Sequence, residues 1–181
     1  MNNRPVAMAL PSLADIPAYA LPDGFALRDY QPGDARHWMR IQQASDRLTV
    51  FPSGFFRRKF GVDNAALAAR QLYLLGPRAQ PIGTATAWWE DTPEGAVGLV
   101  HWVAILPTYQ GQGLARPLLS VVCTRLAALG HRSARLRTST ARVPAINLYL
   151  RFGFQPIIDS PAARDAWRSI LPDLKYPLGS V

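Results

Sequence analysis

A glycine-bearing segment in the middle of the chain has the composition of an anion-binding turn. It joins an apolar run to an amphipathic stretch and reads Gln110-Gly111-Gln112-Gly113-Leu114-Ala115. A turn between a buried strand and a helix N-terminus presents unpaired backbone N–H groups, and the helix dipole adds partial positive charge there. The two glycines carry no side chain where a phosphate would approach the backbone. We therefore expect free backbone amides at residues 111–116, facing an anionic group.

Two common phosphate-binding patterns do not match this segment. The Rossmann fingerprint needs three spaced glycines and an acidic residue about 20 positions later, whereas here there are two glycines and no such acid. The Walker Gly-Lys-Ser/Thr is absent as well. Pro117 fits the first turn of a helix that begins near Gly113, because its missing N–H costs little there. Taken alone, the glycine pattern favours a tight structural turn.

The elements that position this turn follow from hydrophobic patterning. Residues 97–105 form a nearly continuous apolar run, typical of a central strand buried on both faces. Residues 113–129 repeat apolar side chains at helical spacing, and Gly130 fits the end of that helix. The pattern also predicts strands at 25–30, 71–75, 82–90, 134–138 and 154–158, helices at 35–45, 144–152 and 162–171, and a loop with short helices at 49–69.

This order of elements predicts an α+β domain without internal repeats. Four prolines in the first 24 residues predict an irregular N-terminal arm at 1–24, followed by a single domain at 25–181. The one cysteine, Cys123, excludes an intramolecular disulfide framework and favours a cytoplasmic location. No apolar run approaches the roughly 20 residues of a membrane-spanning helix, so no membrane association is expected.

A second motif lies downstream of the turn, beyond one predicted helix and one predicted strand. Residues 110–115 resemble the Q/R-x-x-G-x-G/A signature of the GNAT superfamily of acyl-CoA-dependent N-acyltransferases. Residues 145–154, Ala-Ile-Asn-Leu-Tyr-Leu-Arg-Phe-Gly-Phe, are similar to the A-I-x-L-Y-x-x-x-G-F segment that closes the GNAT fold. The resemblance covers about Phe25 to Ile158. It implies a central mixed sheet with splayed central strands flanked by helices, and transfer of acetyl from acetyl-CoA to a primary amine of a small molecule or a peptide.

The same resemblance implies roles for particular residues. The turn amides would hold the CoA pyrophosphate, and the strand before the turn would pair with the pantetheine arm. The cofactor-binding residues implied in this way are Val103, Ile105, Gln110, Gly111, Gln112, Gly113, Leu114 and Ala115. Tyr149 would protonate the departing CoA thiolate, because a phenol with a pKa near 10 is protonated at neutral pH. The alternative for Tyr149 is a core tyrosine with a satisfied hydroxyl.

The attacking amine must lose a proton, so a base or a water chain to one is needed. His101 is the preferred base, since it lies in an otherwise apolar strand and its reference pKa is close to 7. Strand alternation places His101, Val103 and Ile105 on one face. A core histidine bonded to backbone is the equally favoured alternative. Glu90 is the second candidate base, although a surface carboxylate is its favoured interpretation.

Helical geometry chooses between two polar residues of the second motif. Arg142 and Tyr149 are seven residues apart and share a helix face, whereas Asn147 lies about 200° from Tyr149. We therefore assign cofactor contact to Arg142, where many family members carry Asn, and expect Asn147 to face away. Cys123 is expected to be a packed thiol, and the three histidines lack metal-ligand spacing, so no metal is expected. An acceptor pocket could be lined by Phe55, Phe56, Trp88, Trp89 and Trp102, although most aromatic side chains belong to the core.

The charge balance admits an anionic partner without requiring one. Twenty Lys and Arg face 12 Asp and Glu, a net charge of +8, but the basic residues are scattered. Without a run of five or more like charges, a nucleic-acid partner is not expected. The expected partners are acetyl-CoA and an amine acceptor, and a homodimer stays open as the assembly. The alternatives are transfer of a longer acyl group and a non-catalytic CoA-binding regulatory module.

Overall fold

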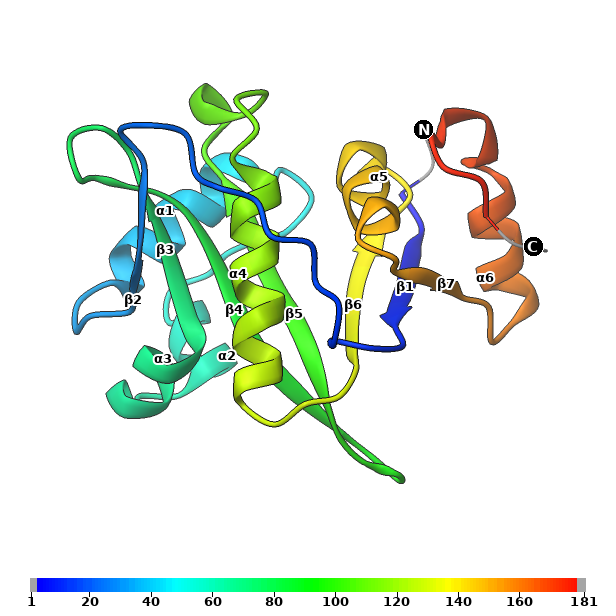
Figure 1. The fold of residues 1–181 in the computed structure, drawn as a ribbon, viewed down its shortest axis with the longest axis horizontal. Coiled ribbons are helices and arrows are strands. Elements are labelled where there is room, and N and C mark those ends of the chain that lie inside the picture. The colour runs from blue at the N-terminus through cyan, green and yellow to red at the C-terminus, as the bar shows by residue number, and fades with distance from the viewer. Residues whose placement is uncertain (1–2, 179–181) are drawn as a thin grey trace. The chain divides into compact units, whose positions relative to one another are not determined.

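The structure is a computed structural model that describes residues 3–178. The chain forms two compact units. The first unit comprises Met1–Pro17, Trp89–Leu99 and Leu126–Val181, and the second comprises Ala18–Trp88 and Val100–Arg125. Strands contribute to a mixed seven-stranded sheet in the order β2-β3-β4-β5-β6-β1-β7 (Figure 1). This is the α+β class with a mixed sheet and flanking helices that the sequence predicts. None of the helices within the described residues is long and apolar enough to cross a membrane.

The second unit is built on antiparallel strands. Strand β2 (Ala26–Asp29) pairs with β3 (Gln71–Leu75), which pairs with β4 (Pro81–Thr92). Strand β5 (Gly95–Ile105) begins in the first unit and ends in the second. Helix α1 (Ala35–Ser45) packs on α2 (Phe55–Phe60), and α3 (Asn64–Arg70) packs on β2 and β3. Helix α4 (Ala115–Ala128) follows β5 after the short 3-10 helix η1 (Pro107–Tyr109).

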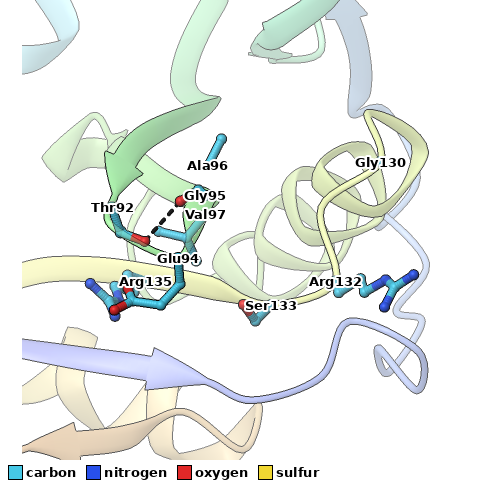
Figure 2. Close-up of a pocket in the computed structure, with 9 residues that line it drawn as sticks. All are labelled: Thr92, Glu94, Gly95, Ala96, Val97, Gly130, Arg132, Ser133 and Arg135. Atoms are coloured by element: carbon cyan, nitrogen blue, oxygen red, sulfur yellow. Dashed lines mark hydrogen bonds between the residues drawn. The ribbon is translucent and has the colours of Figure 1, made fainter.

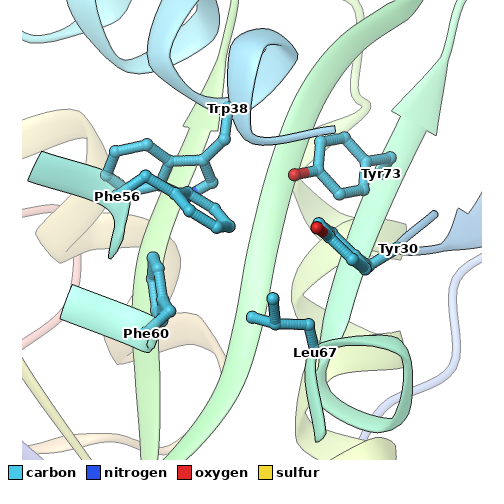
Figure 3. Packing of buried hydrophobic residues seen from close by; sticks show 6 residues of the cluster. All are labelled: Tyr30, Trp38, Phe56, Phe60, Leu67 and Tyr73. Atoms are coloured by element: carbon cyan, nitrogen blue, oxygen red, sulfur yellow. The ribbon is translucent and has the colours of Figure 1, made fainter. Parts of the chain in front are cut away.

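Aromatic side chains form the core of the second unit beside α1 and α2. Trp38 of α1 is fully buried, and Phe56 and Phe60 of α2 point toward its ring (Figure 3). Their ring centroids each lie 5.5 Å from Trp38 in edge-to-face arrangements. Buried aromatic side chains remove large apolar areas from water, and edge-to-face pairs add a further small gain. This packing holds two short helices that have little intrinsic stability of their own.

The first unit is built around β6 (Ala134–Ser139). It pairs antiparallel with β1 (Pro5–Leu10), which in turn pairs with β7 (Gln155–Ile157). Strand β6 also pairs in parallel with β5, through Gly98 with Ala134 and Leu99 with Arg135. Helix α6 (Pro161–Arg168) packs on β1 (Figure 1), α5 (Val143–Arg151) precedes β7, and a 3-10 helix, η2 (Leu171–Asp173), follows α6. The splay of the central strands stays a prediction.

The prediction of an irregular arm at residues 1–24 is wrong for the segment that forms β1. Val6, Met8 and Leu10 alternate with less buried neighbours, as expected for a strand with one face in a core. Pro5 is tolerated because it is the first residue of the strand. The division into an arm at 1–24 and one domain at 25–181 remains a prediction.

Candidate functional site

The predicted site residues divide between the two units. The glycine turn, the end of β5 and His101 belong to the second unit, whereas Glu90, Arg142 and Tyr149 belong to the first.

The glycine turn has the geometry that its sequence predicts. Gly111 and Gly113 have φ angles of 77° and 79°, in the left-handed region that favours glycine. A Cβ atom at either position would meet no other atom within 4 Å, so open space lies beside both residues. Helix α4 begins at Ala115, two residues later than predicted, and Pro117 lies in its first turn as expected.

The backbone amides of this turn are free to bind a ligand. Within residues 3–178, none of the amides at positions 111–115 donates a hydrogen bond to another protein group. The residues from Gly111 to Gly113 are exposed, so water or an anion can reach these donors. Several N–H groups in sequence, at the positive end of a helix dipole, form an anion-binding concavity. The turn therefore fits a phosphate group.

Side chains brace the strand that leads into the turn. The Nε2 atom of Gln110 donates to the carbonyl oxygen of Ile105 at 2.8 Å, and the Oγ atom of Ser45 donates to the same oxygen at 3.0 Å. Two donors occupy both lone pairs of that oxygen. A ligand lying along β5 must then pair with other groups of the segment, such as those of Val103. The side chain of Gln110 supports the strand in this arrangement.

The predicted common face of His101, Val103 and Ile105 is wrong, because the backbone turns at Trp102. Trp102 has a φ of 52°, which interrupts the alternation of side chains along β5. The His101 ring lies 5.9 Å from Phe60, and the adjacent Trp102 ring lies 5.5 Å from Phe55, so consecutive side chains both contact α2. His101 is half-buried among aromatic rings. Its role as a base stays a prediction.

Four of the aromatic residues considered for an acceptor pocket belong to the packed cluster or lie against it. Phe56 is buried within it, and Phe55, Trp88 and Trp102 are partly buried against it. Lys59 lies with its Nζ atom 5.5 Å from the centroid of the Phe55 ring. These contacts assign the rings to the core of the second unit.

Glu90 is held in ion pairs within the first unit. Its carboxylate accepts from Arg137 and lies 3.4 Å from Arg135. A carboxylate whose two oxygen atoms are both engaged by guanidinium groups has its hydrogen-bonding positions turned toward those groups. This geometry favours a structural carboxylate over the second candidate base.

Tyr149 lies on α5 close to the point where that helix ends. The residue is 8% exposed, and its ring packs edge-on against Phe154 with centroids 5.9 Å apart. Its carbonyl oxygen accepts from the amides of Phe152 and Phe154, and Gly153, with a φ of 86°, reverses the chain into β7. The second motif thus encodes a helix end that fixes the backbone of Tyr149.

Arg142 and Asn147 occupy different surroundings. Arg142 stands at the N-terminal boundary of α5, with its Nη1 atom 3.4 Å from the Oγ atom of Ser139. The Asn147 side chain is engaged by the C-terminal segment: its Oδ1 atom accepts from the Lys175 amide at 2.7 Å, and its Nδ2 atom lies 3.4 Å from the Asp173 carbonyl oxygen. These contacts give Asn147 a structural role, and its orientation away from Tyr149 stays a prediction. Cofactor contact by Arg142 stays a prediction.

The cysteine and the potential metal ligands do not form a further reactive site among the described residues. Burial raises the pKa of Cys123 to about 12, so its thiol is protonated at neutral pH and is not a nucleophile. Among the described residues, no group of three or more His, Cys, Asp or Glu side chains could hold a metal ion.

A pocket of about 490 Å³ lies in the first unit, beside the β4–β5 turn. Figure 2 shows its lining, in which Arg132 points away from Glu94 and Arg135. The lining residues are Thr92, Glu94, Gly95, Ala96, Val97, Gly130, Arg132, Ser133 and Arg135. None of them is among the predicted site residues, so this pocket is separate from the candidate chemistry.

Sequence reasoning missed the residues of α1 that contact β5. Gln42 donates to the carbonyl oxygen of Trp102 at 2.8 Å, and Ser45 contacts Ile105 as described above. Both contacts join residues 60 positions apart in the chain. The one signal in the sequence is a glutamine on the apolar face of a predicted helix, because a polar side chain that such a face buries needs a partner.

Comparisons with known proteins agree with this geometry. The model of the Acetyltransferase (GNAT) family matches residues 37–154. A mycothiol acetyltransferase of Pseudarthrobacter chlorophenolicus is 30% identical over 154 residues, covering 78% of this chain and 46% of the relative. One of Nocardia farcinica is 29% identical over 156 residues, covering 83% and 50%. This chain thus spans about half the length of these curated relatives.

A solved structure shares the fold. A GCN5-related N-acetyltransferase of Sphaerobacter thermophilus superposes with a TM-score of 0.69 at 22% identity, covering 86% of this chain and 50% of that one. At this identity the likeness establishes the fold alone, whereas the family match covers more than half of the chain. The chain therefore belongs to the acetyltransferase (GNAT) family.

Proposed function

We propose that the chain transfers an acetyl group from acetyl-CoA to a primary amine by direct attack. The single observation that supports this most strongly is the row of free amides at residues 111–115, at the start of α4 and beside two left-handed glycines. These amides suit the pyrophosphate of CoA, and GNAT acetyltransferases use acetyl-CoA as cosubstrate. The backbone of Val103 and the amide of Ile105 would pair with the pantetheine arm, and Arg142 would meet a phosphate of the cofactor.

In the proposed reaction, the amine nitrogen attacks the thioester carbonyl carbon. The new C–N bond forms, the C–S bond breaks, and the CoA thiolate takes a proton from the hydroxyl of Tyr149. The proton of the amine passes to His101 or to water. A backbone amide near Ile105 would stabilise the negative charge on the tetrahedral oxygen. We propose Tyr149 as the acid. Glu90 is given no role in the reaction, because two arginines hold its carboxylate.

The acceptor is proposed as a small molecule or a peptide with a primary amine. The curated relatives are mycothiol acetyltransferases, so an acceptor of that type belongs in any substrate panel. We further propose that the protein acts in the cytoplasm without a nucleic-acid or membrane partner. The +8 charge then serves in part to attract the phosphates of CoA.

The decisive experiment measures thiol release from acetyl-CoA with a panel of mycothiol-type acceptors, small amines and peptides. We expect release that depends on one class of acceptor, with the acetylated product identified by mass spectrometry. Parallel reactions with longer acyl-CoA donors test the choice of acyl group. Saturable CoA binding without release for any acceptor would instead indicate a non-catalytic regulatory module.

A further inference from the structure

A buried amide side chain on α1 holds an unusual backbone conformation in β5. Gln42 is 2% exposed, and its Nε2 atom donates to the carbonyl oxygen of Trp102 at 2.8 Å. Trp102 has a φ of 52°, in the left-handed region. A residue with a Cβ atom in that region costs about 1–2 kcal/mol. Such a conformation persists only where surrounding contacts specify it.

The contacts on Trp102 come from both its backbone and its ring. Its indole ring lies 5.3 Å from Trp38 and 5.9 Å from Phe51. Ring packing fixes the side chain, but it does not by itself determine the direction of the peptide carbonyl that follows. The hydrogen bond from Gln42 supplies that direction, because the amide of a fully buried glutamine has little freedom to move.

A second contact from α1 fixes the other end of the same strand segment. Ser45 lies three residues after Gln42, on the same face of α1. Its Oγ atom donates to the carbonyl oxygen of Ile105 at 3.0 Å. Gln42 and Ser45 together, here named the α1 brace, thus hold the carbonyl groups at both ends of residues 102–105.

We propose that the α1 brace positions the backbone of residues 102–105 to receive the pantetheine arm of the acyl donor. This inference rests on the proposed function, and it makes Gln42 and Ser45 positioning residues that act through the strand. The brace orients the peptide groups between Trp102 and Ile105. The phosphates would bind the amides of the glycine turn at residues 111–115, which are not part of the brace.

Because the brace and the glycine turn would act on different portions of CoA, two ligands give a selective test. CoA contains the pantetheine arm, whereas 3′-phospho-ADP contains the same nucleotide and pyrophosphate without the arm. Replacing Gln42 by Met removes the donor and keeps a similar length. Gln43→Met is the matched control, because Gln43 is the exposed neighbour on the same helix.

Binding of both ligands to the full chain is measured by calorimetry. We expect Gln42→Met to weaken CoA binding about fivefold to tenfold, the effect of one lost hydrogen bond, and to change 3′-phospho-ADP binding less than twofold. Ser45→Ala should show the same selectivity with a smaller effect, and it keeps the test valid should Gln42→Met fail to fold. Gln43→Met should change neither affinity.

Other outcomes separate the two proposals. Equal weakening of both ligands by Gln42→Met and Ser45→Ala, or no weakening of either, would overturn the brace while leaving the proposed function intact. Wild-type protein that bound neither ligand would overturn the proposed function, and the brace with it. Faster backbone hydrogen exchange over residues 102–105 in Gln42→Met than in Gln43→Met is expected as well, without any ligand present.

Discussion

Single residues in this protein owe their properties to their immediate partners. Asn147 lies on α5 two positions before Tyr149, and its side chain is engaged by the C-terminal segment. Glu90 has the right chemistry for a base, but two arginines hold it. The type of a residue therefore suggests a catalytic role. The hydrogen bonds and ion pairs of its side chain decide whether it can perform that role.

Tyr149→Phe tests the proposed acid. The substitution keeps the ring packed against Phe154 and removes only the hydroxyl, so the fold and cofactor binding should remain. General acid catalysis contributes about 10²–10⁴-fold to rates, and we expect kcat to fall by about 10²-fold, with KM for acetyl-CoA within twofold of wild type.

Tyr30→Phe is the control, because it removes a tyrosine hydroxyl that bonds Asn64 in the core of the second unit. Its kcat should match that of wild type. An unchanged kcat for Tyr149→Phe would remove Tyr149 from the mechanism. Loss of activity in both variants, with lowered thermal stability, would indicate damage to packing instead.

At the scale of elements, the glycine turn works because its backbone takes a conformation that other residues resist. The two glycines, Gly111 and Gly113, indicate this conformation in the sequence, since left-handed positions favour glycine. Trp102 takes a similar conformation without any such signal. The turn could thus be predicted, whereas the interruption of β5 could not, because it depends on contacts from α1 far away in the chain.

Gly113→Ala should weaken cofactor binding through the backbone alone. Its Cβ atom would meet open space, so no clash arises, but the φ of 79° becomes strained by about 1–2 kcal/mol and the amides reorient. We expect CoA and 3′-phospho-ADP to bind about tenfold more weakly. This joint loss contrasts with the selective loss expected for Gln42→Met.

Gly130→Ala is the matched control for backbone strain. Gly130 follows α4 with a φ of 89°, and a Cβ atom there would also meet open space. Gly130→Ala should lower the midpoint of thermal unfolding by about as much as Gly113→Ala does. It should leave the affinities for CoA and 3′-phospho-ADP unchanged. Wild-type affinities in Gly113→Ala would refute the assignment of the turn to phosphate binding.

Other elements show where prediction from sequence ends. The helices and strands from residue 26 onward follow their hydrophobic periods closely, and α1 begins after Asp34 as expected. The Asp34 side chain, however, makes no capping bond and pairs with Arg28 instead. Strand β1 was not predicted, because prolines flank it and no partner lies nearby in the sequence. Its partners, β6 and β7, lie more than 100 residues away.

At the scale of the whole molecule, stability in acid depends on a buried ion pair. Asp34 is 4% exposed, and its carboxylate accepts from Arg28 at 2.5 and 2.8 Å and from the Gln31 amide at 2.7 Å. Burial alone would raise the pKa of Asp34, but these hydrogen bonds and the Arg28 charge hold the pKa below its ordinary value. The pair therefore stabilises the fold wherever Asp34 is ionised.

The sign of the pH effect follows from that lowered pKa. The stabilisation is fully present above the unfolded pKa of about 3.9, and it is lost as pH falls through the lower folded pKa. Asp34→Asn should lower the free energy of unfolding by about 2–3 kcal/mol at pH 7, and the difference from wild type should shrink below pH 4. Urea unfolding at pH 7, 5 and 3 measures both.

Asp29→Asn is the comparison for an exposed pair. Asp29 meets Arg125 at 2.7 Å, but its side chain is 55% exposed, so its loss should cost under about 1 kcal/mol. A constant difference between wild type and Asp34→Asn from pH 7 to pH 3 would show that Asp34 contributes through packing and not through its charge.

The single buried thiol of Cys123 has a practical consequence for enzymology on this protein. Because burial keeps it protonated, a disulfide reagent such as Ellman's will not react with the folded chain on the time scale of an assay. With acceptors that carry no thiol, each yellow thiolate ion formed during turnover then counts one molecule of CoA released. When the same reagent is added without substrate, a slow rise in absorbance measures the rate at which unfolding exposes Cys123. One reagent therefore measures both turnover and unfolding.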